Sequence, residues 1–245
     1  MAAPNRLERP AFYALRPGGW RDAITILHPP YTAWHLSYVA VGACAAPTLH
    51  TDRLAASLGA FFLAVGVSAH ALDELHGRPL RTQVTDRVLV VVAAAALLGA
   101  VAIGVAGAIV VSPTVVPLVA AGGFLVIAYN LELFGGRFHS DLWFAVAWGA
   151  FPALTGYWIN ALAMHVQGVL VAGACLLLSV AQRRLSTPVR QLRRHTLSVG
   201  GSQRLDDGSV IELDAARLAA PLDGALRACA LGLALLATGL TAARL

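Results

Sequence analysis

An apolar run in this chain ends in the stretch Gly66-Val-Ser-Ala-His-Ala-Leu-Asp-Glu-Leu-His-Gly-Arg-Pro-Leu80. The stretch places a histidine, two adjacent carboxylates and a second histidine before a Gly-Arg-Pro turn. Ionisable groups inside or at the end of a membrane helix are costly to bury and tend to be functional. The stretch therefore predicts a membrane helix and marks the place along it where chemistry is expected.

The composition of the whole chain also favours a membrane protein. The 245 residues are 58% hydrophobic and 13% charged, with a mean hydropathy of +0.68, unlike an ordinary soluble domain. Several apolar segments reach the roughly 20 residues that cross a bilayer core. We expect an all-α multipass transmembrane helical bundle of about seven spans. The expected spans are residues 31–47, 54–75, 88–107, 114–134, 141–162, 166–180 and 219–242.

Two segments are expected outside these spans. Residues 1–30 should form a tail and a short interfacial segment, because Met1–Arg21 is arginine-rich and lacks the apolar core of a signal peptide. Residues 182–218 are too rich in arginine to span. Within them, Asp207-Gly208 separates the runs Thr196–Val199 and Ser209–Leu213, a pattern typical of a β-hairpin. We expect residues 31–245 to form a single transmembrane domain.

The distribution of the basic residues indicates how the chain is oriented in the membrane. All 18 are arginine, the formal net charge is +5, and most lie in loops on the same side as the N-terminal tail. This pattern indicates a plasma-membrane protein with a cytoplasmic N-terminus and its C-terminus on the opposite side. It does not favour nucleic-acid binding, and the lack of lysine excludes Schiff-base chemistry. The three cysteines lie in separate apolar segments and are expected to be buried free thiols.

This topology brings several polar side chains to one end of the bundle. On a regular helix, His70, Asp73 and Glu74 lie close to one face, whereas His76 points away. Spans two, four and six end on the same side, so Asp73 should face the residues from Tyr129 to Glu132 and the arginines after span six. The further candidates at that end are Asn130, Arg137 and Arg190.

Two kinds of metal chemistry fit these residue types. Adjacent carboxylates such as Asp73 and Glu74 are the oxygen ligands that Mg²⁺ prefers. A set of imidazoles and carboxylates would instead suit a transition metal and redox or hydrolytic chemistry. The members of that alternative set are His70, Asp73, Glu74, Glu132 and His139.

Three motifs occur in a recognisable order. His28-Pro-Pro-Tyr-Thr32 precedes the first span, and Asp73-Glu-Leu-His-Gly-Arg-Pro-Leu80 is followed by Thr82-Gln-Val-Thr85. Tyr129-Asn130 is followed by a glycine-bearing loop and Trp148-Gly-Ala-Phe-Pro-Ala-Leu-Thr-Gly156. Over roughly residues 25–195, the chain resembles the UbiA superfamily of intramembrane prenyltransferases. It differs in lacking the second Asp-rich motif, because residues 182–195 contain no acidic side chain.

The resemblance implies an enzyme that binds an isoprenoid diphosphate or related lipid for prenyl transfer or cyclisation. It implies that Asp73 and Glu74 hold Mg²⁺, that Glu132 assists catalysis, and that Arg78 lies near the diphosphate. The other residues expected to bind substrate are His70, Tyr129, Asn130, Arg137 and Arg190. The expected partners are an isoprenoid or lipid substrate and membrane lipids. A non-catalytic lipid-binding protein derived from this family remains an alternative, as does the transition-metal enzyme.

Overall fold

The computed structural model describes residue 7 and residues 9–245. The protein is mostly helical, at 74%, and six helices of the described part are long and apolar enough to cross a membrane. These helices are Thr51–Leu75, Asp86–Val110, Pro113–Asn130, Asp141–Ala161, Val166–His195 and Ala215–Ala242. The helical content and the six apolar helices indicate an integral membrane protein of the all-α class.

Three of the six long helices contain a π-helical turn. The first comprises α3 (Thr51–Phe61), the π turn η1 (Phe62–Ala69) and α4 (His70–Leu75). The fourth comprises α8 (Asp141–Ala145), η3 (Val146–Ala150) and α9 (Phe151–Ala161). In the fifth, α10 (Val166–Arg190) continues into η4 (Gln191–His195). A π turn changes the direction in which the following side chains point, and such turns often occur at functional sites.

The remaining long helices are more regular. They are α5 (Asp86–Val110), α6 (Val116–Asn130), which follows the 3₁₀ turn η2 (Pro113–Val115), and α11 (Ala215–Ala242). Two short helices are α1 (Trp20–Ile26) and α7 (Leu133–Gly136). The strands β1 (Ser202–Arg204) and β2 (Val210–Glu212) form an antiparallel hairpin in which Gln203 is opposite Ile211.

Helix α2 (Pro29–Ala45) corresponds to the first expected span but is shorter than the six long helices. Its 17 residues are about 26 Å long, against a hydrocarbon core of about 30 Å. Most of its side chains are buried, and it packs against α9 and α11. Six of the seven expected spans thus have the length and apolarity to cross, while α2 is an interior helix of the same bundle.

The contact between α2 and α9 depends on glycine. A Cβ atom on Gly42 would lie 2.0 Å from the carbonyl oxygen of Ala153, and one on Gly156 would lie 2.1 Å from that of Val39. Neither glycine has room for a side chain. The two backbones therefore touch at two points, as is common where small residues line a membrane helix interface.

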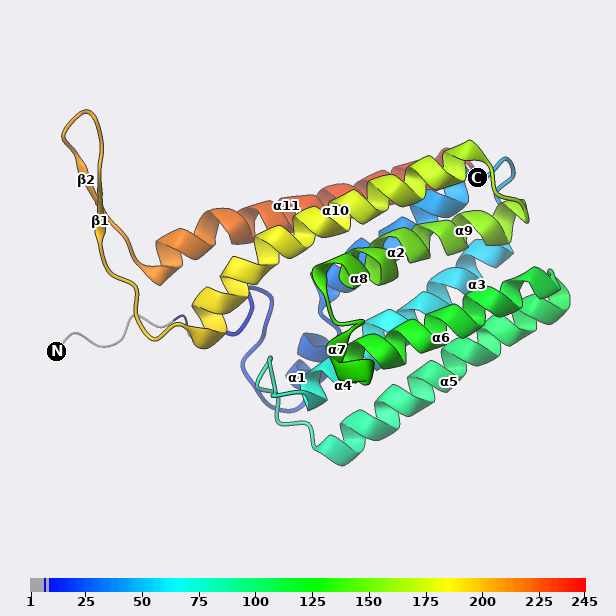
Figure 1. Ribbon diagram of the computed structural model, residues 1–245, viewed down its shortest axis with the longest axis horizontal. Helices are drawn as coiled ribbons and strands as arrows, with labels where there is room; N and C mark the ends of the chain where they lie inside the picture. Colours follow the sequence, from blue (N-terminus) through cyan, green and yellow to red (C-terminus); the bar gives the residue numbers. More distant parts are fainter. Residues whose placement is uncertain (1–6, 8) are drawn as a thin grey trace.

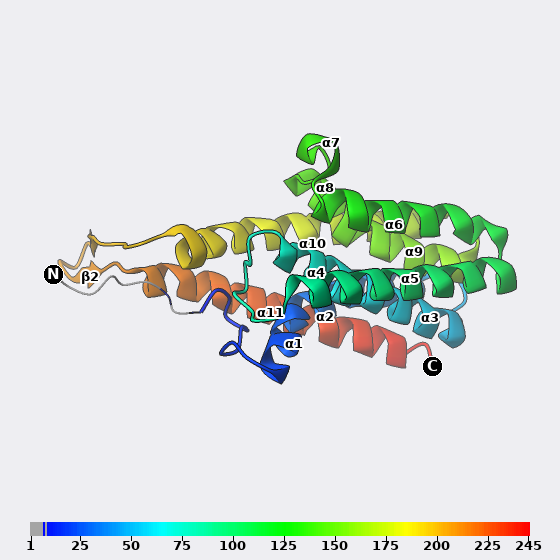
Figure 2. The ribbon, with the colours of Figure 1, turned by 90° about the horizontal axis from the view of Figure 1, so that it is seen from below.

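The helices α4, α6 and α10 end at the same end of the bundle, as expected from the alternation of spans. We call this the arginine end, after Arg183, Arg190 and Arg194. Figures 1 and 2 show α10 and α11 running side by side beyond the other helices to the β-hairpin. The segment after residue 9 lies at this end, whereas Leu245 lies at the other (Figure 1).

Three details differ from the sequence-based expectations. The sixth span does not end near Val180, because α10 continues to Arg190 and η4 to His195. The hairpin is confirmed, but its first strand is Ser202–Arg204 rather than the expected 196–199. Among the free cysteines, Cys44 and Cys175 are buried, whereas Cys229 is exposed on the outer face of α11.

Candidate functional site

A polar cavity of about 140 Å³ lies at the arginine end of the bundle. One wall is an irregular segment, Pro10–Tyr13, which we call the N-terminal strap. The other walls come from α2, η1, α4, α6, the α8–η3 region and α10 with η4. Side chains that are far apart in the sequence therefore meet in one small space. The polar and charged lining residues are Tyr13, His28, Tyr31, His35, His70, Asp73, Tyr129, Asn130, His139, Gln182, Arg183, Ser186, Arg190 and Arg194.

Six of the residues predicted from the sequence line this cavity. They are His70, Asp73, Tyr129, Asn130, Arg190 and, from the alternative metal set, His139. His70 and Asp73 are three residues apart on α4, so they share one side of the helix. Tyr129 and Asn130 reach the cavity at the C-terminal end of α6. The prediction that Asp73 faces Tyr129 and the later arginines is therefore correct in its geometry.

Glu74 does not line the cavity, in contrast to the prediction that it joins Asp73. Its fully buried carboxylate accepts hydrogen bonds from the backbone N–H of Leu80 at 2.9 Å and of Thr82 at 2.9 Å. It also accepts one from the Thr82 hydroxyl at 2.8 Å. The loop can fold back onto the carboxylate because Gly77, Arg78 and Arg81 all have positive φ angles. Glu74 thus closes the Gly77–Thr82 loop.

Three more predicted site residues also lie outside the cavity. Arg78 pairs with Asp86 and donates a hydrogen bond to the Val84 carbonyl, so it is part of the same loop. Glu132 is exposed at a left-handed backbone position, and its carboxylate lies 3.9 Å from His139. Arg137 is exposed in the following loop. The regular helix assumed for Glu132 ends at Asn130, which turns this side chain outward.

The two adjacent carboxylates should respond differently to neutralisation. Glu74→Gln replaces an acceptor oxygen by an NH₂ group facing a backbone donor, and hydrogen bonds to charged groups contribute about 1.5–3 kcal/mol each. We expect Glu74→Gln to lower the free energy of unfolding by about 3 kcal/mol and to expose Arg78 and Arg81 to trypsin. Asp73→Asn should change it by less than about 0.5 kcal/mol. Denaturant titration in detergent measures both, and equal destabilisation would contradict the assignment.

Positive charge dominates the cavity. Among the described residues, three guanidinium groups line it, from Arg183, Arg190 and Arg194, against the single Asp or Glu carboxylate of Asp73. Arg183 Nε donates a 2.6 Å hydrogen bond to the exposed carboxylate of Asp141. Asp73 has no ion-pair partner among the described residues. Clustered guanidinium groups provide the planar, charged donors that bind phosphate oxygens.

Buried aromatic and imidazole groups form another side of the cavity. His28 stacks on His70 with 4.1 Å between ring centroids, and the Tyr13 hydroxyl lies 2.6 Å from His28 Nδ1. Burial raises the pKa of Tyr13 well above its ordinary value, so the phenol stays protonated. Burial, followed by repulsion from His70, holds the pKa of His28 well below its ordinary value. His28 Nε2 is buried without a hydrogen-bond partner among the described residues.

The neutral state of His28 predicts an acid-sensitive fold. In the unfolded chain a histidine gains its proton near pH 6.5, whereas folded His28 stays neutral below that pH. The unfolded state then binds more protons, so stability is complete above about pH 6.5 and falls by up to about 1.4 kcal/mol per pH unit below it. Thermal unfolding of wild type and His28→Gln between pH 5 and 7.5 measures this. An unchanged pH slope in the variant would disprove the assignment.

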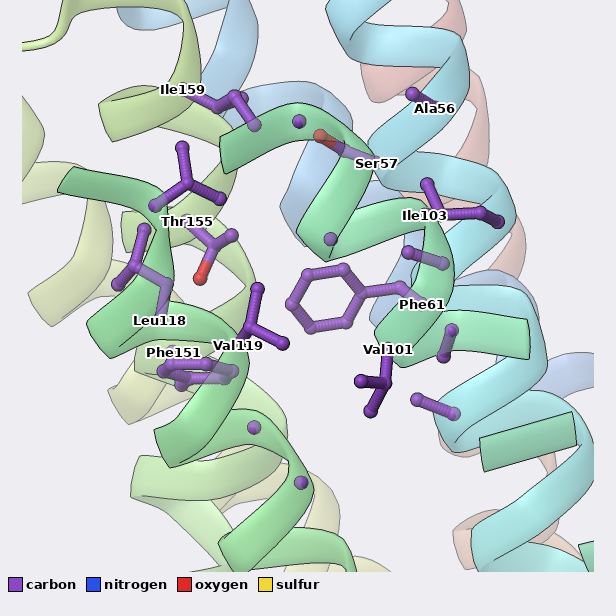
Figure 3. A pocket seen from close by; sticks show the side chains of 18 of the residues that line it. Ala56, Ser57, Phe61, Val101, Ile103, Leu118, Val119, Phe151, Thr155 and Ile159 are labelled. Atoms are coloured by element: carbon purple, nitrogen blue, oxygen red, sulfur yellow. The ribbon is translucent and has the colours of Figure 1, made fainter. Parts of the chain in front are cut away.

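A second cavity of about 340 Å³ lies between α3, α5, α6 and α9 and is almost wholly apolar. Figure 3 shows side chains from all four helices converging on it. Phe61 projects into its middle, with Val101 and Ile103 on one side and Leu118 and Val119 on the other (Figure 3). Its far end is bordered by Asp52 and Arg53 at the start of α3. A cavity of this size and lining suits a hydrocarbon chain.

The two cavities are neighbours that share lining residues. Val65 in η1 and Trp148 in η3 line both of them. Both residues belong to π turns, so the two irregular helix segments lie where the polar and the apolar spaces adjoin. The chain matches no family model, no curated protein and no solved structure. Its candidate site is therefore characterised by its own geometry, as a polar, cationic space beside an apolar one.

Several residues of the site were missed or given another role from sequence. The sequence also suggests a contact between helices for His35, beside Trp34 in the first expected span; its Nδ1 does lie 2.7 Å from the Trp148 carbonyl oxygen, and its ring also lines the polar cavity. The strap and Gln182 were not predicted at all. The sequence feature that could have indicated Gln182 is its position one residue before the arginine cluster. The helix that carries it continues where a loop was expected.

The arrangement of possible metal ligands among the described residues differs from that of the expected metal sites. They contain no cluster of three or more His, Cys, Asp or Glu side chains that could hold a metal ion. The carboxylate oxygens of Glu74 are occupied by the loop, which leaves Asp73 as the only Asp or Glu side chain from the described part of the chain that lines the cavity. Of the two carboxylates that were expected to hold Mg²⁺, Asp73 thus lines the cavity and Glu74 is bound to the loop.

Proposed function

We propose that this protein is an integral membrane enzyme, similar to the UbiA superfamily, that acts on an isoprenoid diphosphate or a related lipid anion. The observation that supports it most directly is that a cationic polar cavity and an apolar cavity are neighbours and share the lining residues Val65 and Trp148. An amphipathic molecule with an anionic head and a hydrocarbon tail has the matching distribution of polarity. The reaction proposed is prenyl transfer or cyclisation.

The head group is assigned to the arginine end. Arg190 and Arg194 approach the cavity from α10 and η4, and Arg183 approaches from about two turns earlier in α10. Guanidinium groups bind phosphate oxygens through paired, charge-assisted hydrogen bonds. His28 Nε2, which has no partner among the described residues, is a further group for a ligand oxygen. The departure from the family pattern is that arginines take the place of the second acidic motif.

The tail is assigned to the apolar cavity. Between Val65 and Asp52, which both line this cavity, the helix is about 20 Å long at about 1.5 Å per residue. A hydrocarbon chain that starts at the shared border would lie against Phe61 and Phe151 (Figure 3). Burying apolar area contributes about 25 cal/mol per Å². The tail would therefore supply much of the affinity and hold the head group at the arginines.

The proposed chemistry is heterolytic cleavage of the allylic carbon–oxygen bond. The electron pair leaves with the diphosphate, where the guanidinium groups stabilise the developing charge. The allylic cation forms beside the aromatic rings of Tyr129, Phe144 and Trp148, which line the same cavity and attract cations. An acceptor or a double bond of the same molecule then attacks the cation, and a proton is lost. Asp73 is the carboxylate placed to accept that proton.

Magnesium remains a prediction. A bound Mg²⁺ would supply charge neutralisation of the diphosphate. Asp73 is the carboxylate of the cavity that would hold it, because Glu74 is committed to its loop. The described residues offer fewer carboxylate ligands for Mg²⁺ than the two Asp-rich motifs of the family. We therefore assign the main electrostatic role to the arginines. Measuring activity with and without Mg²⁺ tests whether the ion takes part.

The orientation proposed places the arginine end in the cytoplasm and the C-terminus on the opposite side of the plasma membrane, following the positive-inside rule. Arg78, Arg81, Arg183 and Arg190 all lie at or near that end. Water-soluble anions and head groups on the cytoplasmic leaflet would then reach the polar cavity. Protease protection of tags in inside-out and right-side-out vesicles tests the orientation.

The test of the proposal uses purified protein in detergent with farnesyl diphosphate. We expect binding, measured by calorimetry, and release of pyrophosphate with a prenyl product detected by mass spectrometry. Binding without pyrophosphate release would favour the non-catalytic lipid-binding alternative. Stoichiometric iron, zinc or copper in the purified protein would favour the transition-metal enzyme. Absence of farnesyl diphosphate binding would overturn the proposal.

A further inference from the structure

A buried ion pair joins η4 to α11 beside the polar cavity. Arg193 Nη2 donates a 2.5 Å hydrogen bond to Asp223 Oδ2, and the two side chains are 11% and 8% exposed. Neither residue lines the cavity. Arg193 nevertheless lies between Arg190 and Arg194, which do line it. The ion pair thus holds the short π turn that carries Arg194 and directly follows Arg190.

The same arginine side chains also hold the N-terminal strap. Arg193 Nη1 donates a 3.0 Å hydrogen bond to the Arg9 carbonyl, and Arg194 Nε donates one of 3.5 Å to the Pro10 carbonyl. On α11, the Arg227 guanidinium lies over the Phe12 ring, 4.8 Å from its centroid. The strap therefore rests on η4 and α11, and its residues form the wall of the cavity.

The ion pair is poorly arranged for stability alone. Arg193 Nε and Asp223 Oδ1 are both buried without a hydrogen-bond partner among the described residues. A buried pair gains net stability only when its geometry is excellent and its other polar atoms are satisfied. Replacing such a pair by apolar residues is often neutral or stabilising. A role in fixing a specific arrangement explains its presence better than a gain in free energy of folding.

We propose that Asp223 is a positioning residue for anion binding, acting through Arg193. The ion pair fixes η4 so that Arg190 and Arg194 face the cavity, and it keeps the strap over the cavity as its wall. Asp223 itself touches no ligand. This inference rests on the anion-binding role proposed above, and it adds α11 and the strap to the structures that determine affinity.

The experiment compares two variants with wild type. Asp223→Asn removes the charge but keeps the shape, and Arg193→Met with Asp223→Leu replaces the pair by apolar side chains. We expect both to bind inorganic pyrophosphate about tenfold more weakly, a change of about 1.4 kcal/mol, while circular dichroism shows them folded at the assay temperature. Glu212→Gln, which removes an exposed acidic charge on the hairpin, is the matched control and should bind as wild type.

A second measurement reports the strap directly. Ala11 is 8% exposed, so a cysteine placed there should react slowly with a water-soluble maleimide in a Cys229→Ser background. Both variants should increase the reaction rate at least about tenfold, as expected when an ordered segment is released. A folded double variant with wild-type pyrophosphate affinity and labelling rate would overturn the proposal. So would a double variant that unfolds, because the pair would then serve the fold itself.

The two proposals can fail separately. If the wild-type protein does not bind pyrophosphate, the assignment of the head group fails, while the labelling rates still report whether Asp223 holds the strap. If the wild type binds and the folded double variant binds equally well, only the positioning role of Asp223 fails.

Discussion

Replacing Arg190 by glutamine is expected to weaken pyrophosphate binding by about 10- to 100-fold. Arg190 is half-buried and lines the polar cavity together with Tyr129 and Asp73. A charge-assisted hydrogen bond contributes about 1.5–3 kcal/mol, and each 1.4 kcal/mol corresponds to a factor of ten in affinity. Calorimetry in detergent at an ionic strength of about 0.15 M, where exposed charges are screened, measures the effect directly.

Arg184 provides the matched control for this prediction. It is exposed on the same helix and does not line the cavity, so Arg184→Gln removes an equal charge from the same region. We expect its pyrophosphate affinity to change by less than about threefold, since exposed charges are screened by salt. Equal losses in Arg184→Gln and Arg190→Gln would indicate a general effect of surface charge and would remove the support for a specific head-group site.

The largest effect on stability is expected at the contact between α2 and α9. Gly156→Val would place a Cβ atom 2.1 Å from the Val39 carbonyl oxygen, where the nearest obstacle is backbone. Gly42→Val meets the Ala153 carbonyl oxygen in the same way. Overpacking typically costs about 1–3 kcal/mol, and a backbone obstacle places these variants at or above the upper end. Thermal unfolding in detergent should show a large drop or loss of folded protein.

Gly173 in α10 is the control for that comparison. A Cβ atom added there meets nothing within 4 Å, so Gly173→Ala should keep or slightly raise stability, by up to about 1 kcal/mol, because alanine favours the helix. If Gly156→Val were as stable as Gly173→Ala, α2 and α9 would not be in backbone contact, and the described position of α2 in the bundle would be wrong.

The sequence predicts the helices well because membrane spans obey a simple length and polarity rule. The same rule counts α2 as a full span, but α2 is shorter than the six long helices. A helix buried among others does not need to match the hydrocarbon thickness. The rule also ends span six too early. The arginines after Val180 read as a loop, yet α10 continues because it packs along α11 beyond the other helices.

The candidate site is partly predictable for a similar reason. Alternation of spans brings Asp73, Tyr129 and Arg190 to one end, and helical spacing places His70 with Asp73. Glu74 has a different role because its carboxylate accepts three hydrogen bonds from the following loop. That loop needs positive φ angles at Arg78 and Arg81, which no local sequence pattern predicts. The strap is held by contacts between residues at opposite ends of the chain, which periodicity cannot detect.

That last contact has a consequence for how the protein is made. The strap leaves the ribosome before the helices that hold it, and Arg227 on α11 is synthesised last among the described residues that contact it. Contacts between distant parts of a chain form late in folding. The polar cavity therefore lacks a stable wall until α11 has inserted. A chain that ends before α11 would contain the cavity arginines without the contacts that hold the strap, so the site forms only after α11 has been synthesised.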